Sequence, residues 1–277
     1  MKERWQLLLF ACLPSQNIRK PEVKPSGGFA SEKTFALLAL LKHLLTMNHH
    51  ILFGPGDKMA DVLQSNYRLL PLLPRFGLTL GTGEKTVEQV CREKGVDCRL
   101  LLLVFNIYTH PDYLPSEKEI SSFPVEKLLD YLYESHQYYR NDKIPHIQKH
   151  LEKIVESYPK ANGRVLRDFF RQYADEVAQH LDYEENTVFP YIRSLLGGKK
   201  ENKYNISVFE KNHTNIEEKL SDLAHIIIKY LPPATDGREE NEILFDLYIL
   251  GDDIARHTLI EDKVLVPLAE LQESKAK

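Results

Sequence analysis

Four long stretches of this chain carry apolar residues that recur alternately every three and every four positions. They run over about residues 124–157, 164–196, 206–230 and 239–272, and the breaks between them contain Gly, Pro or Asn. This spacing gives each helix a single apolar face, which a folded protein buries. The pattern therefore predicts an all-α fold, an antiparallel four-helix bundle. Pro145 lies inside the first stretch and is expected to kink it.

Other regions precede the predicted bundle, which we assign to residues 124–277. Residues 47–112 contain shorter amphipathic patterns with helix-start and turn residues between them, and they predict a small helical domain. Residues 113–123 are interpreted as a linker. Residues 1–46 include a segment rich in Pro, Gly and Lys. They are interpreted as an N-terminal extension that is either flexible or not native, with Met47 as an alternative start.

Composition and charge limit the class of protein. The 277 residues are 43 % hydrophobic and 27 % charged, with a net charge of −4, which argues against a nucleic-acid binder held by phosphate attraction. No apolar run reaches the ~18 residues of a membrane span. Because Cys12, Cys91 and Cys98 make no disulfide framework, the expected location is the reducing cytoplasm. The apolar stretch near the N-terminus is short and contains Gln6, so a secretory signal is not favoured.

Ionisable side chains interrupt the apolar faces of the four predicted helices. A buried carboxylate is unfavourable unless it is paired, and a row of Leu and Ile would avoid that cost. Six such groups aimed at one core need a common partner, and a metal ion is the simplest one. The sequence therefore predicts a metal site with the ligands His136, His180, Glu184, His213, His257 and Glu261.

The spacing of these residues repeats. His180 follows His136 by 44 residues, and His257 follows His213 by the same interval, while 77 residues separate the corresponding members of the two pairs. The bundle thus consists of two helical hairpins, each with a His on one helix and His-x-x-x-Glu on the next. Antiparallel helices bring both to nearly the same depth, since an offset of one or two residues moves a ligand by only ~3 Å. Each hairpin is predicted to supply half of one site.

The set of ligands favours two metal ions. Four imidazoles and two carboxylates exceed what one tetrahedral zinc ion needs. They suit two octahedral-type ions bridged by the glutamates, and imidazole with carboxylate but no thiolate favours iron or manganese. On this interpretation "HLDYEENTVFP" and "HTLIEDKVLVP", which begin at His180 and His257, are the two halves of a two-metal site.

Four motifs, in order, resemble the helix motifs of the hemerythrin-like domain: "ESHQYY", "QHLDYEENTVFP", "EKNHTNIEEKL" and "RHTLIEDKVLVP". Within that family the chain is most similar to the iron–sulfur cluster repair branch, the repair-of-iron-centres di-iron proteins. The resemblance implies two non-haem, carboxylate-bridged iron ions held by the six residues named above. The oxygen-carrying branch has a further His one turn after the third-helix ligand, where this chain has Glu217. The carrier pattern is therefore broken.

Residues 57–110 resemble the small helical domain that precedes the hemerythrin-like domain in the repair branch. The stretch "LLPRFGLTLGTGEKTVEQVCREKGVD" carries this resemblance. That domain usually has adjacent cysteines just after its first Gly-hydrophobic step, whereas this chain has "GLTLG" at residues 77–81. The resemblance therefore does not extend to a thiol-dependent role of such a pair.

Three functional hypotheses remain open from the sequence. The resemblance implies a stress-response protein that repairs iron–sulfur clusters damaged by oxidative or nitrosative stress, with oxygen or nitric oxide as ligand and iron–sulfur proteins as partners. The alternative is a protein that binds or senses oxygen or nitric oxide without repair activity. In the third hypothesis the metal only stabilises the bundle. Enzymatic activity and oligomeric state stay open, but a hydrolase is not favoured because no nucleophile–base pair stands out.

Other polar residues lie close to the predicted ligands in sequence. Glu185 and Asp262 follow the ligand glutamates and are expected to point away from the apolar face. Glu217 is interpreted as a solvated residue or one beside the site. His146 and His150 lie a turn apart and fit either a second metal or gating site or a surface face, of which the surface face is favoured.

Overall fold

In the computed structural model, all the helices named below belong to one compact unit, residues 51–277. The predicted extension 1–46 lies outside the described residues. The residues that the structure describes are 52–156, 158, 160–198, 204–212, 216–232 and 237–275.

Four long helical rods make up the C-terminal part, close to the four predicted stretches. The first, second and fourth rods each consist of two α-helices joined by a five-residue π-helical turn. The third rod consists of two α-helices on either side of residues 213–215, which are not described. The first rod is α7 (Val125–Tyr138), η2 (Tyr139–Lys143) and α8 (Ile144–Glu156), and the second is α9 (Lys160–Tyr183), η3 (Glu184–Val188) and α10 (Phe189–Leu196). The third is α11 (Ile206–Asn212) and α12 (Ile216–Tyr230), and the fourth is α13 (Arg238–Ile260), η4 (Glu261–Leu265) and α14 (Val266–Lys275).

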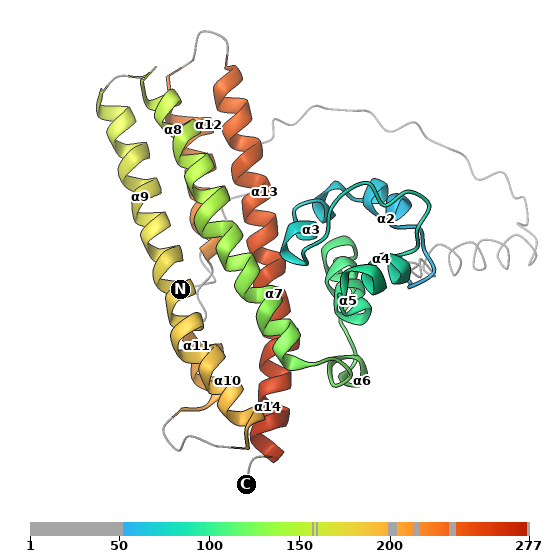
Figure 1. Cartoon of the computed structure of the whole chain (residues 1–277). Helices are drawn as coiled ribbons and strands as arrows, with labels where there is room; N and C mark the ends of the chain where they lie inside the picture. The colour runs from blue at the N-terminus through green and yellow to red at the C-terminus, as the bar shows by residue number, and fades with distance from the viewer. Residues whose placement is uncertain are drawn as a thin grey trace, which may run out of the picture. The chain divides into compact units, whose positions relative to one another are not determined.

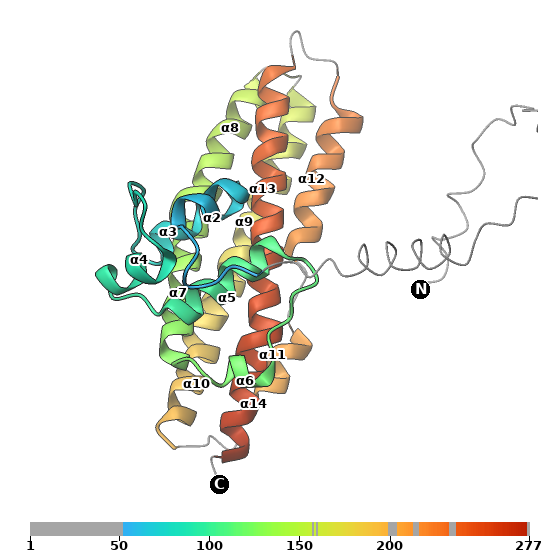
Figure 2. The ribbon, with the colours of Figure 1, turned by 90° about the vertical axis from the view of Figure 1, so that its right-hand side faces the viewer.

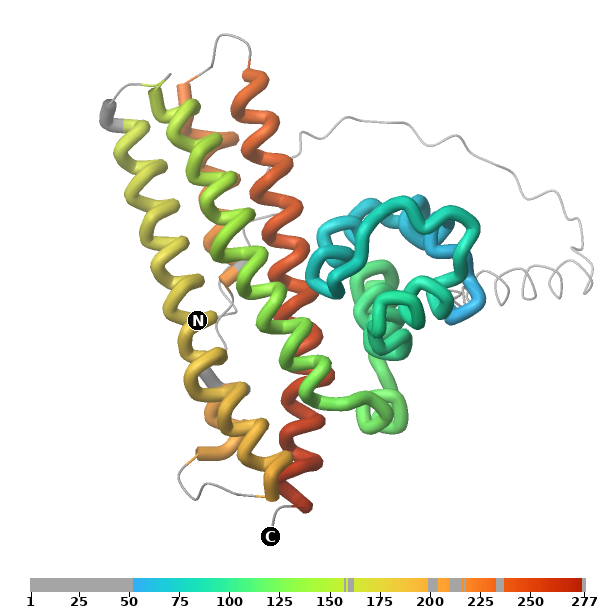
Figure 3. Tube along the Cα trace, in the orientation of Figure 1, coloured from blue at the N-terminus to red at the C-terminus, as the bar shows by residue number. Residues whose placement is uncertain are grey.

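The rods lie side by side in alternating directions (Figures 1 and 2). α8 packs against α9 and α13, and α12 packs against the same two helices, so the four rods close into a ring. At the other end α14 packs against α10 and α11. The tube in Figure 3 shows the chain rising along the first rod and returning along the second. The predicted all-α, antiparallel four-helix bundle is confirmed.

A π-helical turn ends two residues before a proline in three rods. η2 precedes Pro145, η3 precedes Pro190 and η4 precedes Pro267. In each turn the N–H of the residue before the proline donates to the carbonyl five residues back instead of four. A proline in an α-helix removes one N–H donor and collides with the carbonyl four residues back, and the wider turn accommodates both defects. The effect expected of Pro145 therefore takes the form of a widened turn.

Smaller helices precede the bundle. Side chains cap the starts of two of them: Thr86 forms a reciprocal pair with Gln89, and Asp97 accepts from two backbone N–H groups. α3 packs against α7 and α5 packs against α13. The elements are α2 (Met59–Ser65), η1 (Tyr67–Leu69), α3 (Leu72–Arg75), α4 (Val87–Lys94), α5 (Cys98–Thr109) and α6 (Glu117–Ile120).

Gly163 is helical, although the sequence predicts a loop over residues 158–163. α9 begins at Lys160, and a Cβ atom at Gly163 would lie 2.7 Å from Val155 Cγ1 and 3.1 Å from the Val155 carbonyl oxygen. The two helices approach too closely at this point for any side chain. The glycine that signals a break in sequence therefore serves close packing of α8 against α9.

Gly163→Ala is expected to lower the free energy of unfolding by about 1–3 kcal/mol, because the added methyl group forces these helices apart. The matched control is Gly251→Ala in α13, where the nearest atom, Leu220 Cδ1, would be 3.8 Å from the new Cβ. That change should raise stability by up to about 1 kcal/mol through helix propensity. Urea denaturation of both variants measures the difference, and equal effects would contradict the packing argument.

The bundle core is divided into two apolar clusters. One joins the small helices to α7, α10, α11 and α14, and includes Leu128, Phe189 and Leu268. The other joins α8, α9, α12 and α13, and includes Tyr139 and Leu247. Buried ionisable side chains of α7, η3, α13 and η4 lie where the rods pass from one cluster to the other.

The described cysteines do not pair. Cys91 is buried and Cys98 partly buried, both as free thiols, and Cys12 lies outside the described residues. Burial raises the pKa of Cys91 to about 12, so very little of it is thiolate at neutral pH. None of the described helices is both long enough and apolar enough to cross a membrane.

Candidate metal centre

Four ionisable side chains from three rods meet inside the bundle. His136 comes from α7, Glu184 from the start of η3, and His257 and Glu261 from α13 and the start of η4. None is more than 3 % exposed, and each offers a ligand atom within 4.8 Å of the ligand atoms of the others. Imidazole nitrogen with carboxylate oxygen is a set of donors that suits iron, manganese or zinc. These residues could hold a metal ion.

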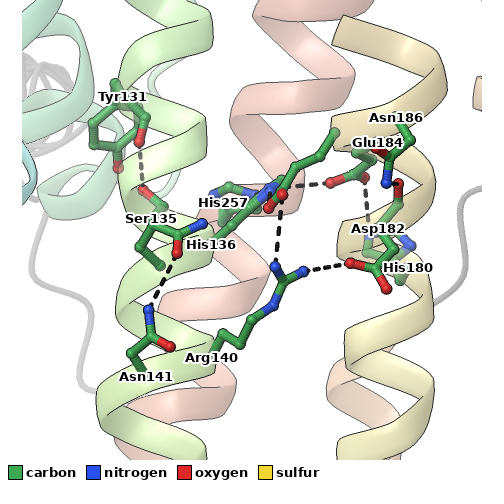
Figure 4. A network of polar contacts seen from close by, with 12 residues as sticks. Tyr131, Ser135, His136, Arg140, Asn141, His180, Asp182, Glu184, Asn186 and His257 are labelled. Atoms are coloured by element: carbon green, nitrogen blue, oxygen red, sulfur yellow. Dashed lines mark hydrogen bonds and ion pairs between the residues drawn. The ribbon is translucent and has the colours of Figure 1, made fainter.

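The contacts within this cluster are short and converge on one region. His136 Nε2 lies 3.3 Å from His257 Nε2 and 3.1 Å from Glu184 Oε2. His257 Nε2 lies 3.0 Å from Glu261 Oε1. Figure 4 shows the two imidazoles extending from neighbouring helices toward Glu184 on a third. The nitrogen atoms that would bind a metal therefore point at one another and at the carboxylates.

Glu184 faces two histidines at once. Its Oε2 atom approaches His136, while its Oε1 atom lies 2.9 Å from Nε2 of His180, one turn earlier on the second rod. The side chain of His180 is 12 % exposed and borders the cluster through this carboxylate (Figure 4). One oxygen directed to each side is the arrangement that a carboxylate bridging two metal ions requires.

The remaining predicted residues fall outside what the structure describes. His213 lies in the gap between α11 and α12, and the side chain of Glu217 is not among those described. Of the six predicted ligands, His136, Glu184, His257 and Glu261 thus come together, and His180 adjoins them. The assignment of all six as ligands stays a prediction.

Glu185 points to the site, and the expectation that it would point away is wrong. Its Oε1 atom lies 3.1 Å from Nδ1 of His136, and its Oε2 atom lies 3.6 Å from a guanidinium nitrogen of Arg140. Arg140 also donates to Asp182 at 2.8 Å. In a regular helix consecutive residues diverge by about 100°, but the extra residue of a π turn shifts that rotation. Both Glu184 and Glu185 therefore reach His136.

Two carboxylates control the protonation of His136. Burial by itself would lower the pKa of His136, but hydrogen bonds to Glu184 and Glu185 outweigh it and raise the pKa to about 9. The metal-free imidazole accordingly carries a proton at neutral pH. A metal ion binds only the deprotonated nitrogen, so binding at His136 releases that proton. Glu185 would then accept from Nδ1–H and keep Nε2 directed to the metal.

Aromatic rings enclose the two central histidines. Phe189 stacks on His136, with ring centroids 5.5 Å apart and planes 20° apart. Tyr139 meets His257 edge-on, at 5.5 Å and 88°. Both aromatic side chains are 1 % exposed. The two aromatic rings restrict the orientation of the imidazoles and shield the Nε2 atoms of His136 and His257 from bulk water.

A buried ion pair ties the small helices to the rod that carries His257. Arg75 of α3 donates to Asp253 of α13, one turn before His257, through both terminal nitrogens, one of them 3.2 Å from Oδ1. The Tyr108 hydroxyl of α5 donates to the same Oδ1 at 2.6 Å. Burial would lower the pKa of Arg75, but Asp253 holds it well above its ordinary value. The guanidinium of Arg75 therefore stays charged.

Comparisons with known proteins agree with this geometry. The family model described as the hemerythrin HHE cation binding domain matches residues 127–269, just over half of the chain. The iron-sulfur cluster repair protein YtfE of Escherichia coli O1:K1 / APEC is 24 % identical over 157 residues, which cover 56 % of this chain and 70 % of that protein. Proteins of the same name from Escherichia coli strain SMS-3-5 and from Escherichia fergusonii match to the same extent. The chain belongs to the hemerythrin HHE cation-binding domain family.

Proposed function

We propose that the cluster holds two non-haem iron ions and that the protein repairs iron–sulfur clusters damaged by oxidative or nitrosative stress. The observation that carries the metal proposal is Glu184, with one oxygen directed to His136 and the other to His180. Glu261 would be the second carboxylate ligand, and its Oε1 atom lies 3.0 Å from His257 Nε2. The names of the similar proteins support the repair role.

The residues of the chain have distinct roles in this proposal. The six predicted ligands hold the metal, and Glu185 orients His136 through the Nδ1 contact. Phe189 packs against the imidazole of His136, and Tyr139 packs against that of His257. Two bound iron ions would supply redox-active metal with positions for a small diatomic ligand. Because the cluster is buried, small ligands such as oxygen or nitric oxide would be favoured over larger ones.

The proposed partners are damaged iron–sulfur proteins, and the proposed location is the cytoplasm. Free thiols at Cys91 and Cys98 are compatible with a reducing compartment. Clients of this kind carry their clusters in proteins too large to enter the bundle. Repair in this proposal therefore means transfer of iron or of a small nitrogen or oxygen species, not docking of the damaged cluster inside the site.

A reactivation assay tests the repair role. The iron-loaded protein is expected to restore activity to a nitric-oxide-damaged iron–sulfur enzyme, whereas Glu184→Leu should restore none, because the bridging carboxylate is gone. Glu270→Leu, at an exposed position of α14, should behave as the unmodified protein. Equal reactivation by Glu184→Leu, or none by the unmodified protein, would remove the repair proposal.

The same iron-loaded preparation also distinguishes the repair role from the two alternative functions. A protein that only binds or senses oxygen or nitric oxide would show a reversible adduct in its absorption spectrum without reactivating the damaged enzyme. A metal that only stabilises the bundle would give neither signal. Removal of such a metal would lower the melting temperature without changing any reactivity.

A further inference from the structure

A second group of metal-binding side chains lies on the outside of the bundle. His146 and His150 are one turn apart in α8, and Asp246 faces them from the adjoining helix α13. Oδ2 of Asp246 lies 3.2 Å from Nε2 of His146 and 3.0 Å from Nδ1 of His150. The two imidazole centroids are 4.3 Å apart. The structure thus adds a carboxylate, 96 residues from His150 in sequence, to the pair of histidines for which the sequence favours a surface face.

These distances match the edges of a tetrahedral metal site. Ligand atoms at the usual 2.0–2.2 Å from a tetrahedral zinc ion are about 3.3 Å from one another. The two nitrogen–oxygen distances fall close to that value, and all three ligand atoms lie within 4.8 Å of each other. A cation just out of the plane of the three ligand atoms would lie within reach of all of them and keep a fourth tetrahedral position open.

One nitrogen of the group is available for a metal. Nδ1 of His150 is buried and makes no hydrogen bond within the described part of the chain, although Asp246 is close. The side chains of His146, His150 and Asp246 are 47 %, 20 % and 16 % exposed. Solvent therefore reaches the group, so a metal ion can enter and a water molecule can complete its coordination.

The outer group is distinct from the buried centre. His146 follows His136 by 10 residues along the first rod, and Asp246 precedes His257 by 11 along the fourth. At ~1.5 Å per residue, both intervals correspond to roughly 15 Å. No ligand is shared, and one metal ion cannot contact both sites.

We propose that His146, His150 and Asp246 form a second metal site, which binds one zinc ion with water in the fourth position. Two imidazoles and one carboxylate are a common zinc set, and the three ligands come from rigid helices. The proposal does not depend on iron in the buried centre or on the repair role.

Zinc binding to the full-length, iron-loaded protein tests this site. The protein is dialysed without oxygen against increasing Zn²⁺, and both metals are then measured per chain by mass spectrometry. The unmodified protein should gain one zinc ion while its iron content stays constant. Asp246→Asn and His150→Ala should bind that ion at least about tenfold more weakly, and neither change touches the buried centre.

His225→Ala is the matched control, since His225 is exposed on α12 and lies outside the group. It should bind zinc as the unmodified protein does. The proposal is overturned if zinc enters only as iron leaves, or if no zinc is gained. It is also overturned if Asp246→Asn retains full affinity, or if His225→Ala loses affinity as much as His150→Ala.

Discussion

Glu261→Gln is expected to weaken iron binding at the buried centre by at least about 100-fold while the bundle stays folded. Glutamine has nearly the same shape but no charge, so it bridges two cations poorly. Substitutions of groups that merely orient ligands already cost about 10–100-fold in metal affinity, and a ligand should cost at least the upper value. Glu261 is fully buried, so no solvent replaces the lost charge.

Iron per chain after anaerobic gel filtration measures this effect, with circular dichroism as the check on folding. Glu270→Gln, the same substitution at an exposed position of α14, should retain all the iron. If Glu261→Gln keeps its iron, the carboxylate is not a ligand. In that case the metal lies elsewhere, and the interpretation of the repeated motif is wrong.

Arg75→Met is expected to lower the free energy of unfolding by about 3–5 kcal/mol. The change leaves Asp253 charged and buried, with the Tyr108 hydroxyl still donating to it, and an uncompensated buried charge has that order of cost. It also removes the cation from above the Tyr138 ring, 4.3 Å away. Urea denaturation of the metal-free protein gives the value.

The double variant Arg75→Met, Asp253→Leu separates a charge effect from a packing effect. It should recover at least half of the loss, because two apolar side chains replace a buried ion pair with little net change. Lys85→Met, which breaks a half-exposed pair with Glu93, should cost less than about 1 kcal/mol. A double variant no more stable than Arg75→Met would show that the ion pair is not the source of the effect.

Periodicity along the chain was sufficient for the fold and for much of the site. Steps of three and four residues placed four helices within a few residues of their observed ends. The same register put His136, Glu184, His257 and Glu261 on faces that must be buried, and the structure brings these four together. The periodicity of an amphipathic helix is a pattern over neighbouring residues, so it can be read from one sequence.

The π turns lay beyond that reasoning, although the sequence carried a signal for them. Each repeated motif has a proline ten residues after its histidine, and a π turn separates the two in both. A regular helix assigns Glu185 to the outside, and only the widened turn brings it to His136. The proline was the sequence signal for the π turn. The orientation that this turn gives to Glu185 depends on how the rod packs against its neighbours.

The sequence by itself determined the four amphipathic helices and the ionisable residues on their buried faces, because those features follow from local spacing and the cost of burying charge. The tertiary structure decided which residues meet across helices. Arg75 and Asp253 are 178 residues apart, and Asp246 joins His146 and His150 from another rod. Such pairs depend on the rotation and depth of each helix against its neighbours. Those are set by the packing of whole side-chain surfaces, which no short stretch of sequence contains.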